Sequence, residues 1–96
     1  MSGDPRSAGG VARDDVTLQR VGRESILHDA RSGRAHVINA SAARVWELCD
    51  GRPMDKLLTE FARPYGLSPE AVRADVERVL AGFAELDLFA DPGPTV

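Results

Sequence analysis

Two histidines, one cysteine and two arginines are the side chains of this sequence that come nearest to forming a reactive site. His28 and His36 fall in neighbouring predicted strands without a third ligand at metal-binding spacing, so we interpret them as surface residues. Cys49 falls on the apolar side of a predicted helix, which indicates a small core residue rather than a nucleophile. Arg31 and Arg34 flank a predicted turn, where they could contact a phosphate or an acidic segment of a partner.

No combination of these residues predicts catalysis. The sequence contains no serine, histidine and acid set, no paired carboxylates in a predicted cleft, and no phosphate-binding glycine loop. Its glycine pair, Gly9-Gly10, falls in a predicted tail. We therefore expect a protein that is not an enzyme and that uses neither a cofactor nor a metal.

The composition is that of one small domain. Of 96 residues, 43% are hydrophobic, which is enough for one compact core but not for two. Fifteen acidic and twelve basic residues give a net charge of −3, the opposite of the balance in most nucleic-acid binders. A single cysteine excludes an internal disulfide. With no long apolar run and no secretion signal, we expect a soluble, cytoplasmic protein that has no contact with a membrane.

The elements that would position any site follow from changes in hydrophobic periodicity. Residues 1–14 and 91–96 contain few apolar side chains that a core could bury. We therefore expect a flexible tail at 1–14, a folded part at 15–90 and a disordered C-terminus at 91–96. The folded part begins with alternating patterns that predict three strands of an antiparallel meander, with a Ser-Gly turn before the last; the strands are 16–21, 25–29 and 34–38.

Beyond the third strand the apolar period becomes 3.6 and predicts three helices. The first spans about 39–51, with a capping residue at its start and Gly51 at its end. The second lies around 54–65, and the third begins at the Ser68-Pro69-Glu70 start signal and continues to about 86. The expected fold class is therefore α+β, with the order βββααα.

The third strand and third helix could form a binding groove. An edge strand has unpaired backbone groups that can accept another strand, and the third strand has no proline to prevent this. A helical wheel places a mixed apolar and charged flank of the third helix beside its buried stripe. If that flank lies next to the strand, a peptide could pair by its backbone between them.

The segment HVINASAARVWELCDG, from His36 to Gly51, combines a strand end, an asparagine, small residues, an apolar-Trp pair and an Asp-Gly pair. With Tyr65-Gly66 and the apolar residues of the last helix, it resembles the PqqD family, the recognition domains for precursors of ribosomally synthesised, modified peptides. The resemblance covers about residues 15–90. Pro53, where the family commonly has a hydroxyl cap, and Pro64 depart from the family pattern.

This resemblance implies a winged helix-turn-helix fold and a peptide chaperone that catalyses nothing itself. It would bind the leader of a precursor peptide as an added strand and present it to a modifying enzyme, in the PQQ pathway a radical SAM protein. Carried over by position, the residues that would line the groove come from the third strand and the third helix; they are Arg34, Ala35, His36, Val37, Ile38, Arg73, Val76, Glu77 and Leu80.

A winged-helix DNA-binding transcriptional regulator is the alternative, because the second and third helices resemble a helix-turn-helix. The start of the would-be recognition helix, at 68–75, contains two acids, one base and no Asn or Gln to read base edges. Phosphates would be repelled there, so we expect no nucleic-acid partner.

Overall fold

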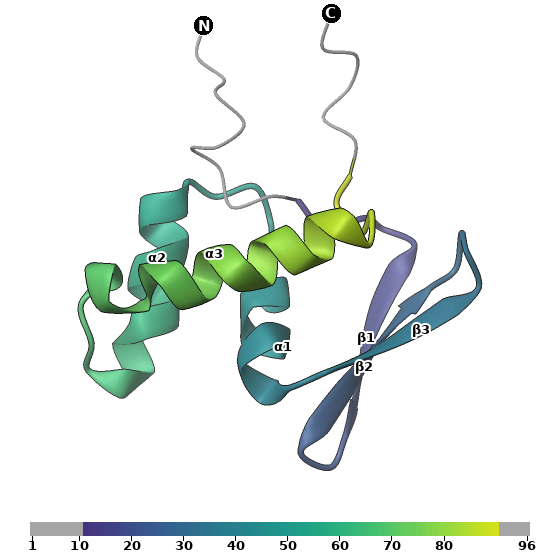
Figure 1. Ribbon diagram of the computed structural model, residues 1–96, viewed down its shortest axis with the longest axis horizontal. Coiled ribbons are helices and arrows are strands. Elements are labelled where there is room, and N and C mark those ends of the chain that lie inside the picture. The colour runs from purple at the N-terminus through teal and green to yellow at the C-terminus, as the bar shows by residue number, and fades with distance from the viewer. Residues whose placement is uncertain (1–10, 91–96) are drawn as a thin grey trace, which may run out of the picture.

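The structure is a computed structural model, and it describes residues 11–90. Three strands are followed by three α-helices, with one turn of 3₁₀ helix, η2, between the second and the third (Figure 1). The predicted α+β class and the βββααα order are therefore confirmed. The expectations for residues 1–10 and 91–96 lie outside the described residues.

The strands form the predicted antiparallel meander. β1 (Val16–Val21), β2 (Glu24–Asp29) and β3 (Arg34–Ile38) lie in the order β1-β2-β3, so β2 is central. The turn between β2 and β3 depends on Gly33, whose φ of +75° is a left-handed conformation that glycine adopts without strain.

The pairing register decides which side chains of β3 face the helices. Leu27 and Asp29 of β2 are buried, and they pair with His36 and Arg34 of β3. Because directly opposite residues point to the same face, His36 and Arg34 also face the helices. Val37 points to the other face and is 64% exposed.

The helices begin where the sequence has capping residues. The Asn39 side chain accepts a hydrogen bond from the backbone of α1 (Ala40–Glu47), and the Ser68 hydroxyl does the same for α3 (Pro69–Glu85). α2 (Met54–Ala62) follows a proline and has no side-chain cap. η2 (Arg63–Tyr65), which includes the second departing proline, ends the helix at the predicted place.

The core lies between the helices and β2. α3 packs on α2 and on α1, and α1 packs on β2. The Trp46 ring meets the Phe83 ring edge to face, with centroids 5.3 Å apart, and both rings are buried in the core. α3 buries one apolar stripe, made of Val72, Val76, Leu80 and Phe83.

The fold begins before residue 15, so the prediction of a tail is wrong for residues 11–14. Val11 forms a β-bridge with Asp50, and Ala12 forms one with Phe89. The side chain of Arg13 is buried. The composition of this segment indicated a tail because it contains few apolar residues, but its order comes from polar contacts with distant parts of the chain.

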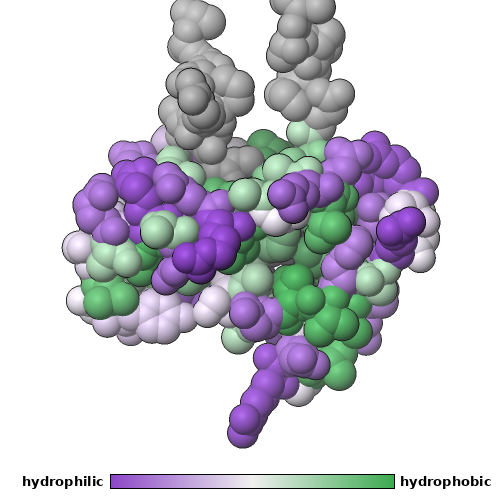
Figure 2. Space-filling model, viewed as in Figure 1, coloured by the Kyte–Doolittle hydropathy of each residue, from purple (hydrophilic) through white to green (hydrophobic). Residues whose placement is uncertain are grey.

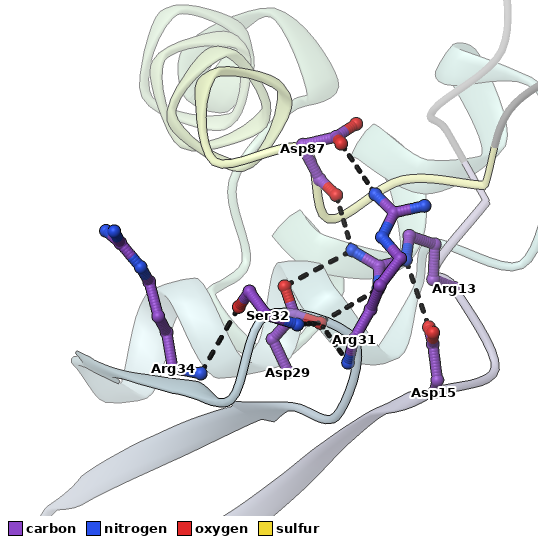
Figure 3. Close-up of polar contacts among 7 residues, drawn as sticks. All are labelled: Arg13, Asp15, Asp29, Arg31, Ser32, Arg34 and Asp87. Atoms are coloured by element: carbon purple, nitrogen blue, oxygen red, sulfur yellow. Dashed lines mark hydrogen bonds and ion pairs between the residues drawn. The ribbon is translucent and has the colours of Figure 1, made fainter.

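Arg13 is the centre of these contacts (Figure 3). Its guanidinium donates to both carboxylate oxygens of Asp29, at 2.8 and 3.3 Å, and to the backbone carbonyl of Asp87 at 2.6 Å. Nε donates to Asp15 at 3.0 Å. The exposed Arg31 binds the Asp87 carboxylate at 2.6 Å. Arg13 therefore joins the N-terminal segment, the β2–β3 hairpin and the end of α3.

The hydrogen bonds from Arg13 hold the pKa of the Asp29 carboxyl well below its usual range, and those to Asp15 and Asp29 raise the pKa of Arg13. Burial opposes both shifts, but the paired hydrogen bonds outweigh it. A carboxyl with a depressed pKa in the folded state stabilises the fold above its unfolded pKa of about 4. That stabilisation is lost as the pH falls toward the folded pKa.

We predict that Asp29→Asn lowers the Tm at pH 7 by more than about 10 °C, because it leaves the Arg13 guanidinium without its buried carboxylate partner. The difference in Tm from the wild type should narrow below about pH 4, where the Asp29 carboxyl of the unfolded wild type begins to take up a proton while that of the folded protein stays ionised. Thermal unfolding between pH 7 and pH 2 measures this. Asp14→Asn, at an exposed neighbour, serves as the control. A difference that stays constant over the whole range would contradict the role given to the ion pair.

Candidate functional site

The outer edge of β3 is open in the part of the chain that the structure describes. β3 pairs with β2 on one side, and the two isolated bridges formed by Val11 and Ala12 involve other segments. The predicted free edge is therefore present among residues 11–90. The N-terminal segment from residue 11 onward does not cover it.

The hydrogen-bonding pattern determines which groups point outward from this edge. Ala30 N–H donates to the Asp15 carbonyl at 2.9 Å, one step beyond the β1–β2 ladder. Along an antiparallel strand, successive residues direct their backbone groups to opposite sides. Because Ala30 directs its groups toward β1, the preceding Asp29 directs its groups toward β3. Arg34, which pairs with Asp29, therefore directs its backbone groups toward β2. It follows that the N–H and C=O groups of Ala35 and Val37 point to the open edge.

We call the surface between the open edge of β3 and the nearby flank of α3 the β3–α3 groove. At its hairpin end is a pocket of about 280 Å³, where Arg34 and His36 of β3 face Glu85, Leu86 and Asp87 at the end of α3. The rest of that pocket is formed by the hairpin turn. In the view of Figure 2, hydrophobic surface gathers between the C-terminal half of α3 and the sheet.

A second pocket, of about 340 Å³, lies beyond the last residue of β3, between α1, α3 and the segment that runs from Phe61 to Leu67. Asn39 and Ser41 at the start of α1 line one side, and α3 contributes Asp75, Arg78 and Val79. Asp75, Val79 and Leu86 lie on one flank of α3, because their separations of four and seven residues correspond to whole helical turns. The two pockets therefore lie along the same flank, about 16 Å apart from Asp75 to Leu86 at 1.5 Å per residue.

The structure brings the predicted β3 residues to this groove. Arg34 and His36 line the hairpin pocket, and the half-buried Ile38 packs against the core beside it. Ala35 and Val37 are exposed, with their side chains on the outer face of the sheet and their backbone groups at the open edge. Whether these five residues contact a peptide stays a prediction.

The α3 residues chosen from the sequence lie elsewhere. Val76 is fully buried and Leu80 nearly so, which places both in the core. Arg73 and Glu77 pair with one another at 3.6 Å on the flank opposite Asp75 and Val79. The helical wheel offered two flanks beside the buried stripe, and the sequence contained no signal for the one that β3 approaches. The α3 residues that the structure places along the groove are Asp75, Val79, Glu85 and Leu86.

Electrostatics distinguish Arg34 from its neighbours. Arg13 is paired with Asp29, and Arg31 with Asp87. The Arg34 guanidinium extends away from this network in Figure 3 and makes no ion pair within residues 11–90. An unpaired guanidinium beside an open strand edge is suited to a carboxylate on a bound strand.

The start of α3 does not have the electrostatics of a DNA-reading helix. Arg73 binds Glu70 at 3.1 Å, and Arg78 binds Asp75 at 3.2 Å. Both exposed arginines are therefore neutralised by neighbouring acids, which leaves no cationic surface for phosphates. Nothing in this part of the structure favours the DNA-binding alternative.

The side chains examined first for reactivity do not form a catalytic or metal site. Cys49 is 3% exposed, and burial raises the pKa of its thiol to about 12, which keeps it protonated. The exposed His28 ring contacts Gln19 at 2.7 Å. Among residues 11–90, no three His, Cys, Asp or Glu side chains are grouped to hold a metal ion. The helices described here are also too short or too polar to cross a membrane.

A further pocket, of about 460 Å³, lies away from β3. It is lined by charged residues of α2 and the preceding loop, including Asp50, Arg52, Glu60 and Arg63. These residues pair internally, Arg52 with Asp50 and Arg63 with Glu60. The hydrogen bond from Arg52 lowers the pKa of Asp50 to about 2. This surface has no unpaired strand edge.

Comparison with known proteins identifies the family. Residues 24–88 match the family described as PqqD, Coenzyme PQQ synthesis protein D, and this match covers more than half of the chain. The chain therefore belongs to the PqqD family. No curated protein matches it.

A solved structure has the same fold. It is described as TbiB1 in Complex with the TbiA(beta) Leader Peptide, and it aligns with a TM-score of 0.69 and 20% sequence identity. The alignment covers 90% of this chain and 99% of the other. At this identity the likeness establishes the fold.

Proposed function

We propose that this protein is a peptide chaperone that binds the leader of a ribosomally made precursor peptide as a fourth strand on β3. The observation that carries the proposal is the open edge of β3, with Ala35 and Val37 directed outward, beside one of two pockets that lie along the same flank of α3. Membership of the PqqD family and the shared fold with a leader-peptide complex support it.

The binding mechanism is strand addition. The peptide backbone pairs with the outward groups of Ala35 and Val37, and alternate peptide side chains enter the groove. The flank of α3 that borders the groove is about 16 Å long. An extended peptide of about five residues spans that length at 3.3 Å per residue. Side-chain burial supplies most of the affinity, because each backbone hydrogen bond contributes only about 1 kcal/mol net.

The peptide is then presented to a modifying enzyme, in a PQQ-like pathway a radical SAM protein. In this role the chaperone supplies no reacting group of its own. Its contribution is to hold a flexible leader in one extended conformation. Cytoplasmic location fits such a role.

A direct test is titration of the protein with the leader peptide encoded in its own gene cluster, followed by amide chemical shifts. We expect the changes to concentrate in β3 and in residues 75–86, which include the second half of α3 and Leu86 just after it. Saturating changes confined to the pocket lined by Asp50 and Arg63, or an absence of binding, would contradict the proposal.

We predict that Val37→Pro weakens leader binding more than about ten-fold, because proline removes the outward N–H and its ring crowds the added strand. The matched control is Arg20→Pro on β1. By the same alternation, the Arg20 N–H points to the opposite open edge of the sheet. Both variants should fold, as judged by circular dichroism, and calorimetric titration should detect a loss only for Val37→Pro. Equal losses would contradict strand addition at β3.

The unpaired guanidinium of Arg34 leads to a second prediction. Arg34→Glu should weaken leader binding about ten-fold, since a carboxylate on the peptide would then face a like charge. Arg23→Glu is the matched control: Arg23 is exposed in the β1–β2 turn, makes no ion pair within residues 11–90, and alters the net charge equally. We expect its effect to stay within about two-fold. If the two variants weaken binding alike, the effect is one of net charge, and Arg34 makes no specific contact.

A further inference from the structure

One glycine of α3 lies between the residues that line the two pockets. Gly82 is on the same flank of α3 as Val79 and Leu86, one turn from each. Val79 belongs to the pocket at the α1 end, and Leu86 belongs to the pocket at the hairpin end. Gly82 therefore occupies the position between the two pockets.

The fold itself gives no reason for a glycine here. Unlike the turn glycines, Gly82 has no left-handed φ, and a Cβ at this position would meet nothing within 4 Å. Glycine inside a helix is less stable than alanine, because it loses more backbone freedom on folding. Alanine would therefore fit the space and stabilise α3.

We propose that Gly82 is the point where a bound peptide approaches α3 most closely and that it makes room for a large apolar peptide side chain. This inference rests on the proposed function and specifies its substrate class: an extended peptide with a bulky apolar residue at the centre of the bound segment. The surroundings fit such a side chain, because Val79 and Leu86 flank the position on α3 and Ile38 packs beside the groove.

The absence of a side chain at position 82 leaves space above the backbone of α3. A helical side chain projects from the surface of the helix toward its neighbour, so alanine at 82 would fill part of the space above the backbone. Leucine would fill the groove between the two pockets. The peptide side chain and any side chain at position 82 therefore compete for the same volume.

The test is a pair of enlarging substitutions, Gly82→Ala and Gly82→Leu, assayed by calorimetry with the synthetic leader peptide from the same gene cluster. We expect Gly82→Ala to raise the Tm by roughly 2–8 °C while it weakens binding several-fold. Gly82→Leu should weaken binding more than about ten-fold. The matched control is Ala84→Leu, at an exposed position on the opposite flank, which should bind within about two-fold of the wild type.

The outcomes are distinct. Higher stability with weaker binding supports the proposal, because damage to the fold would lower both. Wild-type affinity in both Gly82 variants, with shifts still in β3, overturns this inference and leaves strand addition standing. A lower Tm in Gly82→Ala also overturns it, since the fold would then need the glycine. If the wild type does not bind the leader, the proposed function fails and this inference fails with it.

Discussion

The buried guanidinium of Arg13 holds together the parts of the molecule that form the groove. It reaches Asp29 at the end of β2 and the carbonyl of Asp87 just after α3. The exposed pair between Arg31 and Asp87 adds a weaker contact at the same place. These contacts fix the hairpin end of β3 against the end of α3, so the hairpin pocket has a defined width.

The groove combines a directional part and an adaptable part. The open edge of β3 offers backbone groups in a fixed array, and the flank of α3 offers Val79 and Leu86, which line the two pockets, with Gly82 between them. In the proposed complex, the backbone array would accept any extended segment, while this flank of α3 and Arg34 would discriminate among side chains. Arg34 differs from Arg20, Arg52 and Arg73, which are already paired with acids.

Much of the fold could be predicted because its signals are local. The strands follow from alternation, and the two capped helices follow from Asn39 and Ser68, whose side chains act within three residues. The edge position of β3 followed from the same reasoning, since an edge strand can be identified from the order of a meander. Residues 36–51 resemble the PqqD family, and the comparison with known proteins confirmed that the chain belongs to it.

The rest could not be predicted because it depends on distant contacts. Arg13 forms hydrogen bonds with residues that lie 16 and 74 positions away in the sequence. A single arginine in a polar segment gives no local signal of such distant contacts. The flank of α3 that lines the groove depends on the angle at which the sheet meets the helices. Core packing sets that angle, and the helical wheel of α3 is nearly symmetric about its buried stripe. A glycine inside the predicted helix was a visible signal, since it disfavours a helix without an evident reason.

Amide hydrogen exchange at Ala35 and Val37 tests the central claim most directly, because these two N–H groups are the ones directed to the open edge. In the free protein both should exchange rapidly, while the neighbouring amide of His36, bonded to β2, is protected. Saturation with the leader peptide should slow exchange at Ala35 and Val37 at least about ten-fold. Protection at both positions before peptide is added, or unchanged exchange once the peptide is bound, would contradict strand addition on β3.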